Sequence, residues 1–402
     1  MSMWYPPDIE EPKGKPIMKT LNVVLAVSFL LLTSIVSFAE KPTALKVVCF
    51  GDSVTGVYYH TGGRRAYTDM VKIGLKKTYP EATITTINAG ISGNTTSDAL
   101  RRIQKDVLKH KPDIVTIMFG LNDMKRSSLD DYRTNLRTIV TKCQAIDAQV
   151  ILCTPNSIHD TSARPTAKLE QYVAIVRELA KELNLPLADC YANYQEIREE
   201  DSLEWAFLMS DEIHPNMDGH KRIAESITQT ITGKSISLMD VPALLPKLPH
   251  IRKLIAKRKP INILAMPPYD TIAPVKIKQL APESALTITP WEVEGKTLAQ
   301  IEVDSKEMVR GKNYDLVILA VPIEATADSP EAFIQSYSWI LNNSLSFGYQ
   351  EWDVVAAHPS MFTIPEGDAA QRDEWAKKLI RAQDFELLIP EHNQGLNVAP
   401  KN

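Results

Sequence analysis

The sequence has few cysteines, and none of them has the spacing of a metal site. Four occur in 402 residues, at Cys49, Cys143, Cys153 and Cys190. None forms the C-x-x-C spacing of a zinc ligand pair. Cys49 and Cys153 lie inside apolar runs, where a free cysteine commonly packs as a small hydrophobic side chain. We therefore expect no essential disulfide, no metal and no cofactor.

The sequence also lacks a strong charge of either sign. Its net charge of −4 and isoelectric point near 6.1 give no general attraction for nucleic acid or anionic lipid. One short basic stretch, from Arg252 to Lys259, is typical of a solvated linker, so no nucleic-acid partner is expected. With 44% hydrophobic and 23% charged residues, the composition is that of a globular protein, and 402 residues are enough for two domains.

The one long apolar run lies near the N-terminus. It extends from Leu21 to Ala39 and ends in Ser37-Phe38-Ala39, which has small residues at the two positions that a signal peptidase inspects. This pattern predicts a signal peptide within residues 1–39, export to a periplasmic or extracellular space, and no stable membrane insertion after cleavage. The alternative is an uncleaved membrane anchor. A conventional signal peptide begins at Met18, so translation starts at either Met1 or Met18.

After this segment, apolar runs of strand length alternate with stretches of helical period. The alternation predicts a parallel sheet covered by helices on both faces, a three-layer α/β/α domain over residues 40–235. The expected strands are Leu45–Phe50, Thr83–Asn88, Ile114–Phe119, Val150–Thr154 and Pro186–Asp189. The expected helices are Ala66–Lys77, Thr96–Lys109, Leu129–Gln144, Ala167–Leu183 and Met217–Thr232.

Four short polar segments follow these strands or precede the last helix. They are Gly51-Asp52-Ser53, Ser92-Gly93-Asn94, Gly120-Leu121-Asn122-Asp123 and Asp211-Glu212-Ile213-His214-Pro215. Ser53 comes just past the end of a buried strand, where α/β sheets gather their ligands. The sequence therefore predicts a single site at the carboxyl edge of the sheet.

The residue types in these segments suit nucleophilic acyl transfer. The hydroxyl of Ser53 is a weak nucleophile and needs a base within hydrogen-bond reach. His214 is the candidate base, because Asp211, three residues earlier, can orient its ring from the same turn. The reaction also needs hydrogen-bond donors for the developing oxyanion. The candidates are the backbone N–H groups of Ser53 and Gly93 and the side-chain amide of Asn122.

Taken together, the four segments resemble, in the same order, the blocks of the SGNH hydrolase family, also called GDSL esterases and lipases. The resemblance covers residues 45–232 and departs from the family pattern at no catalytic position. It implies the SGNH hydrolase fold, a flavodoxin-like three-layer α/β/α sheet. It also implies a carboxylic ester hydrolase with nucleophile Ser53, base His214, orienting carboxylate Asp211 and an oxyanion hole from Ser53, Gly93 and Asn122. No Gly-x-Ser-x-Gly motif is present, which argues against the ordinary α/β-hydrolase architecture.

Asp52 and Asp123 admit a second interpretation. Together with His214 they have the residue types of a metal-dependent phosphoesterase site. In the family that the chain resembles, such carboxylates hold loops in place. We therefore expect structural roles for Asp52 and Asp123.

A second βαβ series follows a proline-rich, basic stretch over residues 236–260, which indicates a linker. Its expected strands are Ile261–Met266, Leu316–Val321, Asp353–Ala357 and Glu386–Ile389, with a helix at Leu298–Val309. Because Tyr314-Asp315-Leu316 echoes Pro112-Asp113-Ile114, residues 261–402 are interpreted as a shortened repeat of the first domain. The catalytic segments are not repeated in it, so this domain is expected to be non-catalytic. The alternative is that two unrelated α/β domains share this pattern.

The loop that follows Ser53 indicates the substrate. It contains Tyr58, Arg64 and Arg65 among glycines, and aromatic faces with hydrogen-bonding edges suit sugars. No long apolar helix is available to hold a fatty acyl chain. We expect these three residues to bind a short acyl ester, such as an acetyl group on carbohydrate. The alternative is that they only pack the nucleophile loop.

Two other functions are compatible with the sequence. A lysophospholipase or thioesterase of the same family would use the same catalytic residues. From a different class, the chain would be a secreted carbohydrate-binding protein in which residues 261–402 act and the esterase site is vestigial. No oligomeric state is predicted.

Overall fold

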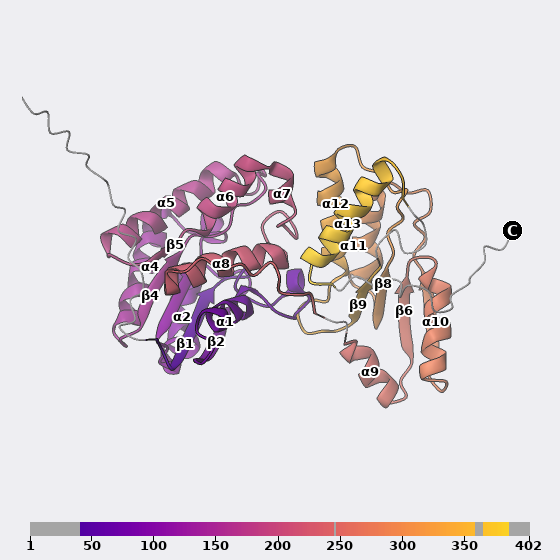
Figure 1. The fold of residues 1–402 in the computed structure, drawn as a ribbon, viewed down its shortest axis with the longest axis horizontal. Coiled ribbons are helices and arrows are strands. Elements are labelled where there is room, and N and C mark those ends of the chain that lie inside the picture. Colours follow the sequence, from indigo (N-terminus) through magenta and orange to yellow (C-terminus); the bar gives the residue numbers. More distant parts are fainter. Residues whose placement is uncertain (1–40, 245–246, 358–364, 386–402) are drawn as a thin grey trace, which may run out of the picture. The chain divides into compact units, whose positions relative to one another are not determined.

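The computed structural model describes residues 41–244, 247–357 and 365–385. These residues form two parallel sheets, each with helices on both faces (Figure 1). The expected signal peptide and the expected strand Glu386–Ile389 lie outside the described residues. Within the described ranges, no helix has the length and apolar character needed to cross a membrane.

The first domain contains a five-stranded parallel sheet in the order β2-β1-β3-β4-β5. Its strands are β1 (Ala44–Gly51), β2 (Thr83–Gly90), β3 (Ile114–Met118), β4 (Gln149–Cys153) and β5 (Leu187–Ala188). The central strand β3 is buried along its whole length, as expected where helices cover both faces of a parallel sheet. The predicted α/β/α fold is confirmed.

Eight helices of the described residues belong to this domain. They are α1 (Tyr67–Thr78), α2 (Thr96–Asp106), α3 (Asp123–Arg126), α4 (Leu129–Gln144), α5 (Thr166–Glu182), α6 (Cys190–Glu200), α7 (Ser202–Ala206) and α8 (Met217–Thr232), with short 3-10 helices at Tyr59–Thr61 and Leu108–His110. Helix α1 packs against α8, and α4 packs between α2 and α5. The predicted bounds of α4 and α8 are correct, because Ser128 and Asn216 cap their first turns.

The second domain contains a smaller parallel sheet in the order β7-β6-β8-β9. Its strands are β6 (Ile261–Ala265), β7 (Leu286–Pro290), β8 (Leu316–Leu319) and β9 (Asp353–Ala356). Its helices are α9 (Pro249–Ala256), α10 (Tyr269–Leu280), α11 (Leu298–Val309), α12 (Pro330–Ser344) and α13 (Asp368–Ala382). Figure 1 shows α11, α12 and α13 along one side of this sheet and α10 on the other. The expected linker contains α9.

The two sheets share particular hydrogen bonds as well as strand order. Asp113, just before β3, donates its N–H to the Lys46 carbonyl of β1 at 2.9 Å and accepts the Lys46 N–H on its carboxylate at 2.7 Å. Asp315, just before β8, makes the same two bonds with Asn262 of β6, both at 2.8 Å. In each domain an aspartate therefore sets the register between the two central strands.

A lysine contact is also repeated. Lys76 of α1 donates to the carbonyl oxygens of the residues four and six positions later, and Lys278 of α10 does the same. The order β7-β6-β8-β9 matches the first four strands of β2-β1-β3-β4-β5. These shared features support the hypothesis that the second domain is a shortened repeat of the first.

Candidate active site

Three adjacent strands bring the predicted site residues to one edge of the first sheet. Gly93 follows β2, Ser53 follows β1 and Asn122 follows β3, and these strands are neighbours in the order β2-β1-β3. Because the strands are parallel, their carboxyl ends meet at the same edge. The loop that precedes α8 adds Asp211 and His214 from a distant part of the chain.

Ser53, His214 and Asp211 form a continuous hydrogen-bonded chain. Ser53 Oγ lies 2.8 Å from His214 Nε2, and His214 Nδ1 lies 2.8 Å from Asp211 Oδ2. The Asp211 carboxylate also accepts the backbone N–H groups of Ile213 and His214, both at 2.8 Å. Backbone N–H groups of the Asp-x-x-His turn thus hold the Asp211 carboxylate in position. With Nδ1 bonded to this carboxylate, Nε2 of a neutral ring is the nitrogen that accepts the hydrogen bond of the Ser53 hydroxyl.

The electrostatics of this chain keep Asp211 ionised. Its burial acts to raise the pKa of the carboxyl, but attraction to His214 and hydrogen bonds from the His214 ring and from the backbone outweigh burial, so the pKa is lowered below its usual value. The ionised Asp211 carboxylate can therefore orient the ring of His214 and stabilise the protonated form of that ring.

The candidate oxyanion donors follow the ends of β1, β2 and β3. Gly93 has a φ of 73°, in the left-handed region that favours glycine, and a Cβ there would meet nothing within 4 Å. Within the described part of the chain, neither the Ser53 nor the Gly93 amide donates a hydrogen bond. The Asn122 amide donates to the Asn94 carbonyl at 3.2 Å and more weakly to Asp52 at 3.5 Å. Donor capacity is thus available on the two backbone amides, and the longer of the two Asn122 bonds, to Asp52, is weak.

Asp52 and Asp123 have loop partners. Asp52 accepts the N–H of Val54 at 3.0 Å, and Asp123 accepts the N–H and hydroxyl of Thr96 at 2.9 and 2.6 Å, which joins the start of α3 to the start of α2. Burial raises the pKa of Asp52 to about 6 and also raises the pKa of Asp123. In the described residues all four cysteines are free and buried, and no three His, Cys, Asp or Glu side chains are grouped to hold a metal.

Arg102 supports the nucleophile loop, although no sequence motif marks it. Its guanidinium donates to the Gly51 carbonyl at 2.7 Å and to the Ala89 carbonyl at 2.8 Å, and it lies 4.6 Å from the ring centroid of Phe50. One side chain of α2 therefore ties together the carboxyl ends of β1 and β2. In the sequence it is one charged residue among several on an amphipathic helix.

Two further histidines lie behind His214. The ring of His60 stacks on that of His214, with 4.4 Å between centroids and 18° between planes, and the ring of His220 stacks on His60 at 5.6 Å. Burial lowers the pKa of His60 well below its usual value and lowers that of His220 to about 3. Both rings are therefore neutral. The His60 ring packs against one face of the His214 ring, and the His220 ring packs against His60.

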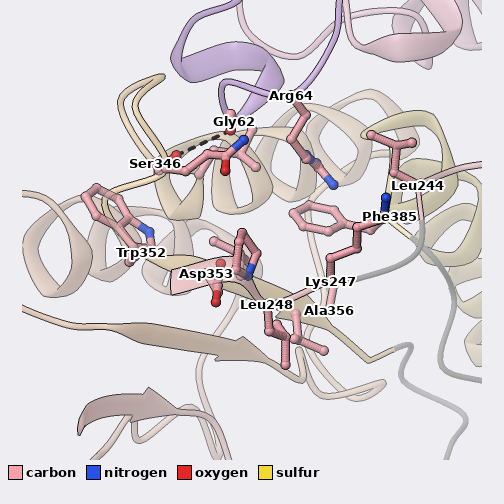
Figure 2. Close-up of a pocket in the computed structure, with 15 residues that line it drawn as sticks. Gly62, Arg64, Leu244, Lys247, Leu248, Ser346, Trp352, Asp353, Ala356 and Phe385 are labelled. Carbon is pink, nitrogen blue, oxygen red and sulfur yellow. Dashed lines mark hydrogen bonds between the residues drawn. The ribbon is translucent and has the colours of Figure 1, made fainter. Parts of the chain in front are cut away.

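The expected substrate residues have other partners in the structure. Arg64 donates to the Asp384 carbonyl at 2.8 Å, and Figure 2 shows its guanidinium beside the ring of Phe385, at the wall of a pocket of about 310 Å³. Arg65 makes a two-pronged ion pair with the buried carboxylate of Asp384. The Tyr58 hydroxyl donates to the Gly90 carbonyl at 3.3 Å. For Arg64 and Arg65 these contacts favour the alternative stated above, a role in packing this loop.

The region that contains these segments is similar to known proteins. The model of the GDSL-like lipase/acylhydrolase family matches residues 49–222, which include all four polar segments. An acetylxylan esterase from Geobacillus stearothermophilus is 34% identical over 169 residues, which make up 39% of this chain and 76% of that protein. Thioesterase 1/protease 1/lysophospholipase L1 from Escherichia coli K12 is 30% identical over 140 residues, 35% of this chain and 63% of that protein.

A crystal structure of an acetylxylan esterase from Geobacillus stearothermophilus is also similar. It is 30% identical, with a TM-score of 0.42, over 48% of this chain and 95% of that chain. The family model and the sequence relative together lead to one conclusion: the chain belongs to the GDSL-like lipase/acylhydrolase family, the SGNH hydrolases, and is a carboxylic ester hydrolase.

Proposed function

We propose that this protein is an exported serine esterase that removes short acyl groups, such as acetyl, from carbohydrate. Ser53 is the nucleophile, His214 the general base and Asp211 the carboxylate that orients it. The observation that carries the proposal is the 2.8 Å separation between Ser53 Oγ and His214 Nε2, continued at 2.8 Å from Nδ1 to Asp211. This separation lies within the reach needed for proton transfer.

In the proposed acylation step, Ser53 Oγ attacks the ester carbonyl carbon while His214 Nε2 takes the hydroxyl proton. The carbonyl oxygen becomes negative and accepts hydrogen bonds from the N–H groups of Ser53 and Gly93 and from the side-chain amide of Asn122. The bond from the carbonyl carbon to the alcohol oxygen then breaks, and His214 gives its proton to the leaving alcohol. The products of this step are an acyl-serine and a free hydroxyl group.

In the proposed deacylation step, water takes the place of the alcohol. His214 Nε2 accepts a proton from water as its oxygen attacks the acyl carbon. The same donors hold the oxyanion, and the bond to Ser53 Oγ breaks as His214 returns the proton to Ser53. The acid leaves and the enzyme is restored.

Acetylated carbohydrate is the proposed substrate class. Its support is the similarity over the catalytic region to a protein named acetylxylan esterase, together with the partly exposed Tyr58 in the loop after Ser53. A lysophospholipase or thioesterase is the second candidate, favoured by the similarity to the Escherichia coli protein. Both candidates use the same catalytic groups and differ in the length of acyl chain they accept.

The test is hydrolysis of p-nitrophenyl acetate, butyrate and octanoate by the protein and by its Ser53→Ala variant. We expect activity on acetate that falls steeply with chain length and is lost in the variant. Acetylated xylo-oligosaccharide and an acyl-coenzyme A would then be compared at equal concentration. Preference for octanoate or for the thioester would replace the proposal with the second candidate, and equal rates for the protein and Ser53→Ala would reject both.

The export proposal and the binding-protein alternative have separate tests. Cleavage after Ala39 predicts Glu40 as the N-terminal residue of the mature protein, which Edman sequencing of the secreted or periplasmic fraction would reveal. A retained Leu21–Ala39 segment would contradict it. Under the esterase proposal, Ser53→Ala abolishes all biological activity, whereas a carbohydrate-binding protein would keep full glycan affinity and function in that variant.

A further inference from the structure

Ser210 links the candidate base to the second domain. It immediately precedes Asp211, and its N–H donates to the His214 carbonyl at 2.8 Å, so its position sets that of the turn. Its hydroxyl donates to Gln383 Oε1 at 3.0 Å and accepts from Asn342 Nδ2 at 2.8 Å. Asn342 lies on α12, and Gln383 immediately follows α13. Both partners of this hydroxyl therefore come from the second domain.

Gln383 reaches the other side of the base as well. Its amide nitrogen donates to the His60 carbonyl at 2.7 Å, and the ring of His60 stacks on that of His214. One side chain thus contacts both the turn that carries His214 and the residue that packs against its ring. The two bonds use the donor and the acceptor of the amide, so exchanging its nitrogen and oxygen would lose both.

Every polar group in this arrangement is removed from water. Ser210 and His60 have no exposed surface, and Asn342 and Gln383 are exposed by 1% and 3%. A buried amide is unfavourable unless its hydrogen bonds are made, so the four residues hold one another in a single arrangement. An interface that served only to join two domains could use apolar side chains at these positions. Here the polar groups are directed at the loop that carries the base.

We propose that Gln383 is a positioning residue for His214, through which the second domain holds the base of the esterase in place. The inference rests on the proposed function of Ser53 and His214. It gives the second domain a role in catalysis that requires no catalytic residues in that domain, which lacks the catalytic segments. Gln383 acts through Ser210 and His60 and does not touch the reacting atoms.

The test is steady-state hydrolysis of p-nitrophenyl acetate by the full-length Gln383→Met variant, which keeps side-chain length and loses both hydrogen bonds. A displaced base predicts a fall in kcat of about 10- to 100-fold with KM changed less than about twofold. The rate at which a fluorophosphonate labels Ser53 is expected to fall by the same factor, because labelling also needs the base. Far-ultraviolet circular dichroism and thermal unfolding establish that the variant is folded at the assay temperature.

Lys378→Met is the matched control. Lys378 lies on α13 and pairs with Glu204 of α7, so it joins the same two domains without contacting Ser210 or His60. It is expected to keep kcat and the labelling rate within about twofold of the wild type. An equal loss in Lys378→Met and Gln383→Met would overturn the inference, since docking in general would then be responsible.

The outcomes separate this inference from the function on which it rests. Wild-type activity combined with an unchanged kcat in Gln383→Met overturns the positioning role alone. Absence of both hydrolysis and Ser53 labelling in the wild type overturns the proposed function, and the inference with it. Should Gln383→Met not fold, Ser210→Ala tests the same link: a fall in kcat at constant KM is expected, and an unchanged kcat rejects the inference.

Discussion

The rings of His60 and His214 lie nearly parallel, 18° apart, with their centroids separated by 4.4 Å. Behind them His220 accepts the backbone N–H of Tyr67 on Nδ1 at 3.2 Å. A neutral ring on the back face of the base restricts its rotation and adds no charge that would oppose its protonation. The arrangement requires that His60 and His220 stay neutral in the folded protein, which has a consequence for stability.

Acid is predicted to destabilise the protein through these buried histidines. An unfolded chain protonates His220 below its usual pKa of 6.5, whereas the folded protein holds that pKa at about 3, so the folded state binds fewer protons between these values. The contribution of His220 to the free energy of unfolding is therefore complete above pH 6.5, and it declines as the pH falls from 6.5 towards 3. Between pH 8 and pH 5 the loss assigned to His220 is about 2 kcal/mol.

The measurement is urea unfolding of the wild type and of His220→Gln at pH 8 and pH 5. Glutamine can still accept the Tyr67 N–H and does not titrate, so the drop in unfolding free energy should be smaller in the variant. Asp52 acts in the opposite direction, because its pKa is raised from 3.8 to about 6, and it contributes equally to both proteins. An identical drop in the two proteins would contradict the prediction.

Removing the side-chain oxyanion donor should lower turnover and leave binding nearly unchanged. For Asn122→Ala we expect kcat on p-nitrophenyl acetate to fall about 10²- to 10³-fold, with KM within about threefold. Asn135→Ala is the control, since the Asn135 amide bonds to Thr96 Oγ1 on α2 and lies outside the proposed site. A rise in KM at constant kcat would instead assign Asn122 to substrate binding.

The Asp211→Asn substitution is predicted to lower kcat strongly, although asparagine has nearly the same shape as aspartate. The amide that replaces the carboxylate no longer favours a proton on Nδ1 of His214, so Nε2 loses its readiness to accept the Ser53 proton, and kcat is expected to fall about 10⁴-fold. The control is Asp218→Asn at the start of α8, which removes only the pair with Lys221. A loss of less than about tenfold in Asp211→Asn would mean that another group orients the base.

Arg65→Met is predicted to affect stability and not substrate binding. The Asp384 side chain is 4% exposed, and without Arg65 it would be a buried carboxylate that, among the described residues, accepts only the Leu244 N–H at 3.3 Å. We expect the unfolding free energy to fall by about 3 kcal/mol, measured in urea at pH 7, with KM unchanged for every ester tested. An increase in KM for carbohydrate esters alone would restore the substrate-binding interpretation.

The sequence was sufficient where a local rule decides the structure. All five strands of the first sheet were predicted to within two residues, because each is a short run of apolar or β-branched residues bounded by polar loops. The bounds of α4 and α8 follow from Ser128 and Asn216, whose side chains satisfy N–H groups of the first turn. The family resemblance likewise depends on short segments and needs no long-range information.

Elements without such local marks were missed. Strand β7 lies at the edge of its sheet and is only partly buried, so Leu286–Pro290 lacks a continuous apolar run. Helix α6 begins directly after β5. The sequence predicts Asp189 as the end of a strand, whereas in the structure Asp189 accepts the Ala192 N–H as an N-cap. Helix α9 begins at Pro249, and a proline in this position is equally typical of a linker.

The site residues that the sequence could not supply all act over long sequence distances. Gln383 bonds to His60 across 323 positions and to Ser210 across 173. Arg102 and His220 look like ordinary helix residues until the strands and loops that they contact are placed beside them. The location of Arg64 and Arg65 after Ser53 predicts contact with substrate, whereas only the structure reveals their partners in residues 383–385 and, for Arg65, the Pro242 carbonyl.

The strand order shared by the two sheets bears on how this chain evolves. Under the repeat hypothesis, an ancestral duplication produced two copies of one scaffold, and only the first retained reactive groups. The loops at the carboxyl edge of the second copy are then under relaxed selection, whereas Asn342 and Gln383 are constrained by the partner they touch. Substitutions at these two positions should therefore be found paired with changes at Ser210 or His60, and a deletion of the second copy should be tolerated only where those contacts have been replaced.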